Sequence, residues 1–221
     1  VVLDPVGVGA SSFRKQTAEQ LLKEVRFDAI RGNISEIKTL ASLCGTQEKN
    51  SGNMAVSDTM DVEKITDKSD HCGKITGIDG SGRGVDADNA DTVTEENLAQ
   101  HISNAKMLSK KLQTIVAITG AIDLVTDGSS CYVIRNGNPQ MEHVTGAGCQ
   151  LSGILTAFLA ANPENKLQAA AAAVCMMGYA GELAAEKSGQ SGSGTYRVSL
   201  MDAVSCMDGD ILERGARYEI R

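Results

Sequence analysis

Hydrophobic and polar positions along this 221-residue chain alternate between short apolar runs and longer helical patterns. Residues 1–3 are consecutive branched apolar residues, and residues 114–119 (Thr-Ile-Val-Ala-Ile-Thr) are mostly apolar, which predicts two buried strands. Residues 95–111 repeat apolar residues along one helical face, directly before the second of these strands. A helix between two buried strands indicates a parallel pair joined by a right-handed crossover. The pattern therefore predicts an α/β fold, with a central, mainly parallel sheet flanked by helices.

The second half of the chain predicts a different arrangement. Two short alternating runs, 121–126 and 130–135, are joined by an Asp-Gly turn and predict a β-hairpin. We expect this hairpin region at an edge of the sheet. Helices are expected over 149–161, which ends before a proline, and over the alanine-rich stretch 164–187. The tail predicts a strand followed by a helix over 196–203.

Residues 44–83 interrupt the pattern, because small and polar residues dominate and the few apolar ones form no stripe. We expect an acidic and polar insertion there, forming a mobile surface loop. Residues 45–97 contain twelve acids and five bases, which accounts for the entire net charge of −7. The rest of the chain is balanced in charge, so no basic surface is predicted, and nucleic acid is not an expected partner.

Cysteine usage and the chain's first residues carry two further expectations. None of the six cysteines forms a C-x-x-C pair, so we expect a reduced protein in the cytoplasm. No uninterrupted apolar run reaches the roughly 18 residues of a membrane span, and no membrane association is expected. The chain begins inside a strand, without Met, which suggests that an N-terminal part precedes Val1.

The segment 144–149 is a glycine-rich loop that leads into a helix. The first N–H groups of a helix are unpaired and lie at the positive end of its dipole, so they attract phosphate. Gly146 and Gly148 allow the backbone to approach such a group closely. Cys149 follows them, where a base would face an incoming hydroxyl. The alternative is an ordinary tight turn before a helix.

Two segments upstream supply further candidate chemistry. Asp4 follows the first strand, and ligands of open α/β sheets bind beyond the carboxyl ends of strands; the alternative is a turn ahead of Pro5. Arg31 lies beside a glycine and is suited to phosphate oxygens. Asn33 and Glu36 are three residues apart at an expected helix start, which also fits a capping box. Together, these residues indicate phosphoryl transfer assisted by Mg²⁺.

With these motifs the chain resembles hydroxyethylthiazole kinase, the thiamin-salvage family of the ribokinase-like superfamily. The resemblance covers residues 1–43 and about 84–221 and implies one ribokinase-like kinase domain over 1–221. Most of the superfamily has Asp at the end of the glycine loop, whereas Cys is typical of thiazole kinases and of some pyrimidine or pyridoxal kinases. The matching stretches are 3–10, 29–33 with Glu36, 84–86, 117–120 and 144–149.

The resemblance implies a role for each matching residue. Asp4 and Glu36 would hold Mg²⁺, directly or through water, with Asn33 in support. Arg31 and Thr119 would contact ATP, the co-substrate.

The glycine loop would serve the reacting groups. Gly146 would lie at the substrate hydroxyl, and the amides of Ala147, Gly148 and Cys149 would form an anion hole for the transferred phosphoryl group. Cys149 would be the general base.

The resemblance also implies the reaction and the partners. The expected reaction is ATP-dependent phosphorylation of hydroxyethylthiazole by a homotrimer, in a parent protein that in fungi is often fused to a thiamin-phosphate synthase. Alternatives are a hydroxymethylpyrimidine or pyridoxal kinase, a nucleotide-dependent dehydratase with Asp in place of Cys149, and a nucleotide-binding module without catalysis.

Overall fold

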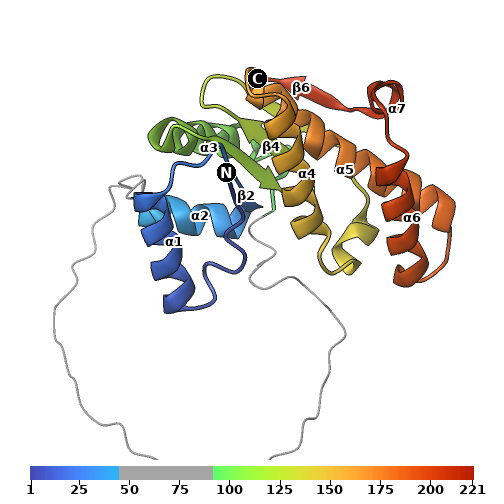
Figure 1. Cartoon of the computed structure of the whole chain (residues 1–221), viewed down its shortest axis with the longest axis horizontal. Coiled ribbons are helices and arrows are strands. Elements are labelled where there is room, and N and C mark those ends of the chain that lie inside the picture. Colours follow the sequence, from blue (N-terminus) through green and yellow to red (C-terminus); the bar gives the residue numbers. More distant parts are fainter. Residues whose placement is uncertain (45–91) are drawn as a thin grey trace, which may run out of the picture.

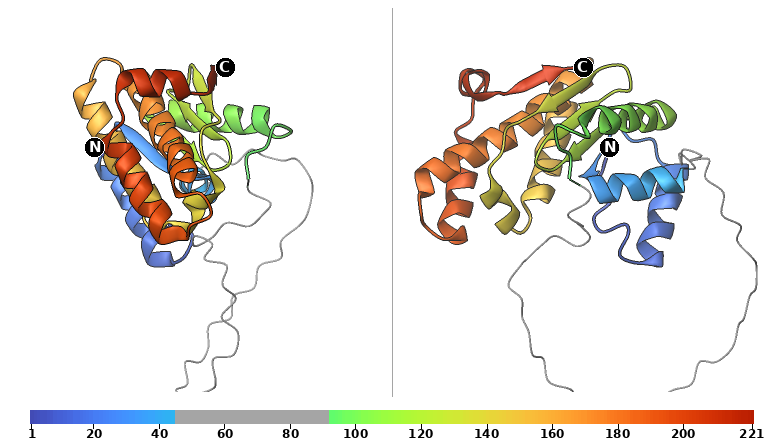
Figure 2. Two further views of the ribbon diagram at one scale, coloured as in Figure 1. Left: turned by 90° about the vertical axis from the view of Figure 1, so that its right-hand side faces the viewer. Right: turned by 180° about the vertical axis from the view of Figure 1, so that it is seen from behind.

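A computed structural model describes residues 1–44 and 92–221. From residue 45 on, the expected insertion 44–83 lies outside the described residues. The described chain forms three layers, with a six-stranded sheet between two groups of helices. Helices α1, α2 and α3 lie on one side of the sheet and α4 and α5 on the other, where α6 packs against α5 (Figures 1 and 2). The expected α/β architecture is confirmed.

The strands lie in the sheet in the order in which they occur along the chain. The first three pair in parallel, and the remaining pairings are antiparallel. Because two antiparallel steps restore the direction, the fifth strand again runs with the first three, and four of six strands point the same way. The strands are β1 (Val2–Leu3), β2 (Ala29–Asn33), β3 (Ile115–Thr119), β4 (Asp123–Thr126), β5 (Cys131–Ile134) and β6 (Tyr218–Ile220).

Two expectations about the second half of the chain need correction. The hairpin β4–β5 is present, but β6 pairs outside β5 and forms the edge of the sheet. The strand expected within 196–203 is instead part of helix α6 (Ser193–Ser205). Tyr196 and Leu200 lie one helical turn apart and are both buried in the cluster that includes α5, so tertiary packing selects the helix.

The helices expected over 95–111, 149–161 and 164–187 are present with small changes at their ends, whereas α7 and the 3₁₀ helix were not predicted. The helix expected to start at 149 begins at Ala147, and the one expected from 95 begins at Leu98. The helices are α1 (Ser12–Glu24), α2 (Ile34–Leu43), α3 (Leu98–Leu112), α4 (Ala147–Ala161), α5 (Lys166–Ser188), α7 (Gly209–Gly215) and a 3₁₀ helix (Pro139–His143).

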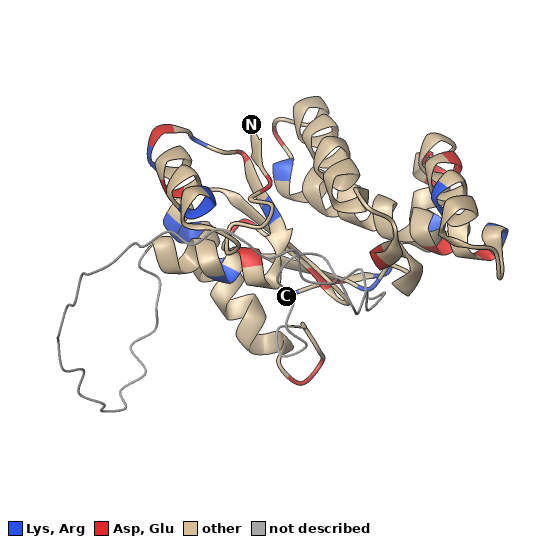
Figure 3. Ribbon diagram, turned by 90° about the horizontal axis from the view of Figure 1, so that it is seen from below, with Lys and Arg blue, Asp and Glu red and all other residues tan. Residues whose placement is uncertain are grey.

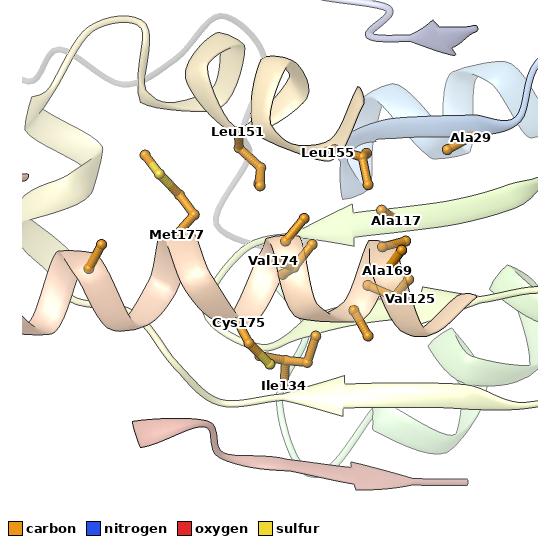
Figure 4. Packing of buried hydrophobic residues seen from close by; sticks show 14 of the residues in the cluster. Ala29, Ala117, Val125, Ile134, Leu151, Leu155, Ala169, Val174, Cys175 and Met177 are labelled. Carbon is orange, nitrogen blue, oxygen red and sulfur yellow. The ribbon is translucent and has the colours of Figure 1, made fainter. Parts of the chain in front are cut away.

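Alternate strand residues face opposite layers, as a period of two requires. Ala29, Ala117, Val125 and Ile134 point toward α4 and α5, where leucines of α4 and the alanine-rich face of α5 pack on them (Figure 4). Their neighbours in sequence, such as Ile30, belong to the second cluster beneath α1, α2 and α3. Small residues on α5 let this long helix lie close to the sheet.

Helix α5 is also long and apolar enough to cross a membrane when judged by length and composition alone. However, 72% of its most apolar window is buried inside the fold, as in a core helix. A buried core helix passes the same test of length and composition, so α5 is only weak evidence for a membrane span.

Charged residues of both signs are interspersed along the described ribbon (Figure 3). Several form exposed pairs, including Lys23 with Glu19 at 2.6 Å and Lys187 with Asp202 at 2.7 Å. Such pairs each contribute only about 0–1 kcal/mol. The two apolar clusters therefore carry most of the stability of the fold.

Candidate active site

The carboxyl ends of β1, β2 and β3 meet at one edge of the sheet because these strands are parallel. Asp4 follows β1, Asn33 ends β2 and Thr119 ends β3. The register places Asn33 beside Thr119. Residues from distant parts of the chain are thus gathered where ligands of open α/β sheets bind.

Arg31 connects these strand ends. Its side chain is only 13% exposed and reaches from β2 to both neighbouring strands. Nη2 donates to Oγ1 of Thr119 at 2.7 Å, and Nη1 lies 3.5 Å from Oδ2 of Asp4. Nε is buried and has no acceptor among the described residues. The guanidinium is therefore held in place while keeping donor capacity for a ligand.

The start of α4 lies directly against this guanidinium. A Cβ atom added to Gly148 would lie 2.7 Å from Nη1 of Arg31, so only glycine fits without moving the arginine. Gly146 has a different task, since its φ of 91° is left-handed and it forms the N-cap of α4. Gly148 thus allows the close approach to Arg31, and Gly146 adopts the left-handed backbone conformation at the N-cap.

The amides at the start of α4 are not equivalent. The Ala147 amide donates to the carbonyl of Val144 at 3.1 Å and closes the turn. Gly148 and Cys149 occupy the next positions of the first turn, where a helix provides no carbonyl partner. Cys149 is exposed and is a free thiol. The strongest anion donors at this helix start are therefore the amides of Gly148 and Cys149.

The carboxylate of Asp4 is 15% exposed and is bonded through one oxygen only among the described residues. Oδ2 accepts from Oγ of Ser152 at 2.6 Å and lies beside Arg31. Oδ1 is buried and has no donor within the described parts of the chain. The turn before Pro5 is closed by the backbone, with the Val6 amide donating to the Asp4 carbonyl at 2.9 Å. The side chain thus points to the site and not into the turn.

Asn33 and Glu36 form the capping box that the sequence offered as the alternative. Oδ1 of Asn33 accepts from the Glu36 amide, and Oε2 of Glu36 accepts from the Asn33 amide, both at 2.8 Å. Oε1 of Glu36 accepts from the amide of Gly7 at 2.9 Å. The buried Glu36 therefore fixes the loop after β1 to the start of α2, and a metal-binding role would add to this structural one.

These residues fit a hydrated Mg²⁺ better than a metal held by protein alone. Within residues 1–44 and 92–221, no three His, Cys, Asp or Glu side chains form a metal-binding group. Mg²⁺ usually takes only one or two carboxylates and completes its shell with water and phosphate oxygens. Oδ1 of Asp4, which has no donor in the described part of the chain, matches such a ligand.

Sequence reasoning missed two residues at this site. Ser152 lies one helical turn after Cys149, and this spacing was the only sequence signal for it, too weak to reveal its bond to Asp4. Asp123 begins β4 with its Oδ1 accepting from the Gly120 amide at 2.8 Å. Burial raises the pKa of Asp123 to about 7, although the Gly120 hydrogen bond and the charge of Arg31 oppose this rise. An acid inside the apolar run 121–126 was the only sequence signal for it.

The fold and the site define a class of protein, an α/β protein whose sheet edge combines a carboxylate, an arginine and a glycine-rich helix start. Such a site suits a phosphorylated ligand and its metal ion. A solved structure of hydroxyethylthiazole kinase from Pyrococcus horikoshii matches the whole chain over 65% of its own length, with a TM-score of 0.70 and 24% identity. This similarity supports the ribokinase-like fold expected from the sequence.

Sequence comparisons identify the family. The model of the hydroxyethylthiazole kinase family matches residues 1–72 and 45–210. Hydroxyethylthiazole kinase from Clostridium acetobutylicum is 44% identical over 99% of the chain and 68% of its own length, and that from Desulfovibrio desulfuricans is 36% identical over 100% and 67%. The chain thus spans about two thirds of the length of these relatives. It belongs to the hydroxyethylthiazole kinase family.

Proposed function

We propose that this chain is the phosphoryl-transfer part of a kinase that phosphorylates the hydroxyl of hydroxyethylthiazole with Mg²⁺ and ATP. Family membership supports the reaction class and the substrate. One observation from the structure supports it most directly, namely the Arg31 guanidinium held between Asp4 and Thr119 directly against Gly148. This contact joins a cation-binding carboxylate to an anion-binding helix start, and phosphoryl transfer depends mainly on such positioning and charge neutralisation.

In this proposal Asp4 and Glu36 hold Mg²⁺, directly or through water, and Asn33 supports Glu36 through the capping box. When bound, Mg²⁺ neutralises charge on the ATP phosphates. Arg31 and Thr119 contact the nucleotide, since the buried Nε of Arg31 still lacks an acceptor within the described chain.

The helix start serves the reacting groups. Gly146 lies beside the substrate hydroxyl, and the amides of Ala147, Gly148 and Cys149 face the transferred phosphoryl group, those of Gly148 and Cys149 most strongly. The exposed thiol of Cys149 accepts the hydroxyl proton as the phosphoryl group arrives.

We further propose that the protein acts in the cytoplasm as a homotrimer. Five free cysteines among the described residues suit a reducing compartment. The trimer, and fusion to a thiamin-phosphate synthase in the parent protein, are supported by the family resemblance alone.

Turnover of ATP with three alcohols tests the function. Purified protein would be assayed with hydroxyethylthiazole, hydroxymethylpyrimidine and pyridoxal, with the Clostridium acetobutylicum relative as the positive control. We expect turnover with the thiazole only. Preference for another alcohol would change the substrate, whereas ATP binding without any turnover would leave a nucleotide-binding module.

A further inference from the structure

The carboxylate of Asp4 is oriented by two donors that approach the same oxygen. Oγ of Ser152 lies 2.6 Å from Oδ2, and Nη1 of Arg31 lies 3.5 Å from it. The other oxygen, Oδ1, is buried without a donor in the described residues. Since buried carboxylate oxygens are normally satisfied, this asymmetry indicates that Oδ1 is reserved for a ligand.

Ser152 has two acceptors within reach but a single hydroxyl proton. Oγ lies 3.2 Å from the carbonyl of Gly148, one turn earlier in α4, and 2.6 Å from the carboxylate. The shorter contact to a charged oxygen is the stronger one, so the proton points to Asp4. The hydroxyl therefore connects two segments 148 positions apart in the sequence.

This connection fixes the distance between two halves of the site. Asp4 follows β1, whereas Ser152 lies one turn after the Gly148 and Cys149 amides on α4. We propose that Ser152 is a positioning residue for phosphoryl transfer. Its hydroxyl holds Oδ2 of Asp4, presents Oδ1 to the divalent cation, and keeps that cation in register with the helix start that binds the phosphoryl group. This inference rests on the proposed function.

Replacement of Ser152 tests the inference with two independent readouts. Steady-state kinetics would give kcat, KM and the Mg²⁺ concentration for half-maximal activity. Binding of Mn²⁺, measured by paramagnetic resonance in the presence of a non-hydrolysable ATP analogue, needs no turnover. Ser152→Ala removes the hydroxyl and Ser152→Thr retains it. Thr156→Ala is the matched control, because its hydroxyl lies one turn further along α4 and bonds only to the Ser152 carbonyl among its described partners.

We expect Ser152→Ala to weaken Mn²⁺ binding and lower kcat by about 10-fold, the usual effect of losing a hydrogen bond that orients a metal ligand. KM for the alcohol should change little, Ser152→Thr should restore both quantities, and Thr156→Ala should alter neither. Unchanged Mn²⁺ affinity in Ser152→Ala would overturn the inference even if the parent is an active kinase. If the parent lacks turnover but Ser152→Ala still weakens Mn²⁺ binding, the proposed function and the role in phosphoryl transfer both fail, and only the orientation of Asp4 toward a divalent cation stands.

Discussion

Position 148 accepts only glycine, because its backbone lies against the Arg31 guanidinium. A Cβ atom there would lie 2.7 Å from Nη1, so Gly148→Ala must displace the arginine from Asp4 and Thr119. We expect kcat/KM to fall by about 10²-fold, as typically follows from a displaced positioning group, without unfolding.

Gly153 offers a control on the same helix, since a Cβ atom there meets nothing within 4 Å. Gly153→Ala should leave activity unchanged and stabilise α4 by about 0.5–1 kcal/mol. Kinetics and urea unfolding of both variants would check this. If Gly148→Ala kept full activity, the contact with Arg31 would have no role in catalysis.

Cys149 carries the second prediction at this scale. If its thiol accepts the hydroxyl proton, Cys149→Ala should lower kcat by roughly 10²-fold, within the usual range for a general base. Cys149→Asp should retain activity, because a carboxylate can accept the same proton. Replacement of Cys206, an exposed cysteine at the end of α6, is the control for loss of an exposed thiol. A loss smaller than threefold in Cys149→Ala would exclude the thiol as the base.

At the scale of elements, the buried acid at the start of β4 makes stability depend on pH. Burial raises the pKa of Asp123 to about 7, so the folded protein binds this proton more tightly than the unfolded chain. The contribution of this group to stability is therefore fully present below its unfolded pKa of about 4 and is lost as pH rises through 7. Asp123→Asn keeps an acceptor for the Gly120 amide and removes the titration.

We expect the parent to lose on the order of 1–3 kcal/mol between pH 5 and pH 8 through this group, and Asp123→Asn to lose correspondingly less. Urea unfolding at both pH values measures the difference. Asp127→Asn, at the exposed turn after β4, removes the same formal charge as a control. An equal pH dependence in the parent and Asp123→Asn would contradict the prediction.

The elements themselves were predictable where one periodicity dominates. Branched apolar runs identified β1 and β3, and the stripe through Leu98, Ile102 and Leu108 identified α3, because burial on one face leaves a repeating pattern. Strand β6 left no such pattern, since Tyr218 and Ile220 are both exposed. Helix α6 was misread because its fate depends on packing against α5, which local sequence does not encode.

At the scale of the whole molecule, local sequence does not encode contacts between distant elements. This limit decides which residues of the site could be predicted. Glycine-rich turns and acids after strands are local features, so Asp4, Arg31, Gly148 and Cys149 could be identified from short motifs. The link between Ser152 and Asp4 depends on how β1 and α4 meet across 148 positions. A serine in an amphipathic helix can have many structural roles, and only the fold shows that this one bonds to Asp4.

The loop that leads to the glycine-rich helix start is anchored by a carboxylate of helix α5. Glu182 of α5 accepts from the Gly137 amide at 2.8 Å, from the Asn136 amide group at 3.0 Å, and from both Nη atoms of Arg217 at 2.8 and 2.9 Å. Its side chain is only 16% exposed. This one carboxylate therefore joins the end of β5, helix α5 and the segment before β6.

We expect Glu182→Gln to lower the free energy of unfolding by about 1–3 kcal/mol, because it removes charged hydrogen bonds from a mostly buried acceptor. Glu186→Gln, on an exposed position one turn further along α5, should change it by less than about 0.5 kcal/mol. Hydrogen exchange would locate the effect, with faster exchange at 136–138 and in β6 and no change in β1. Equal acceleration in β1 and β6 would contradict a local anchor, because it would mean that Glu182 stabilises the fold only as a whole.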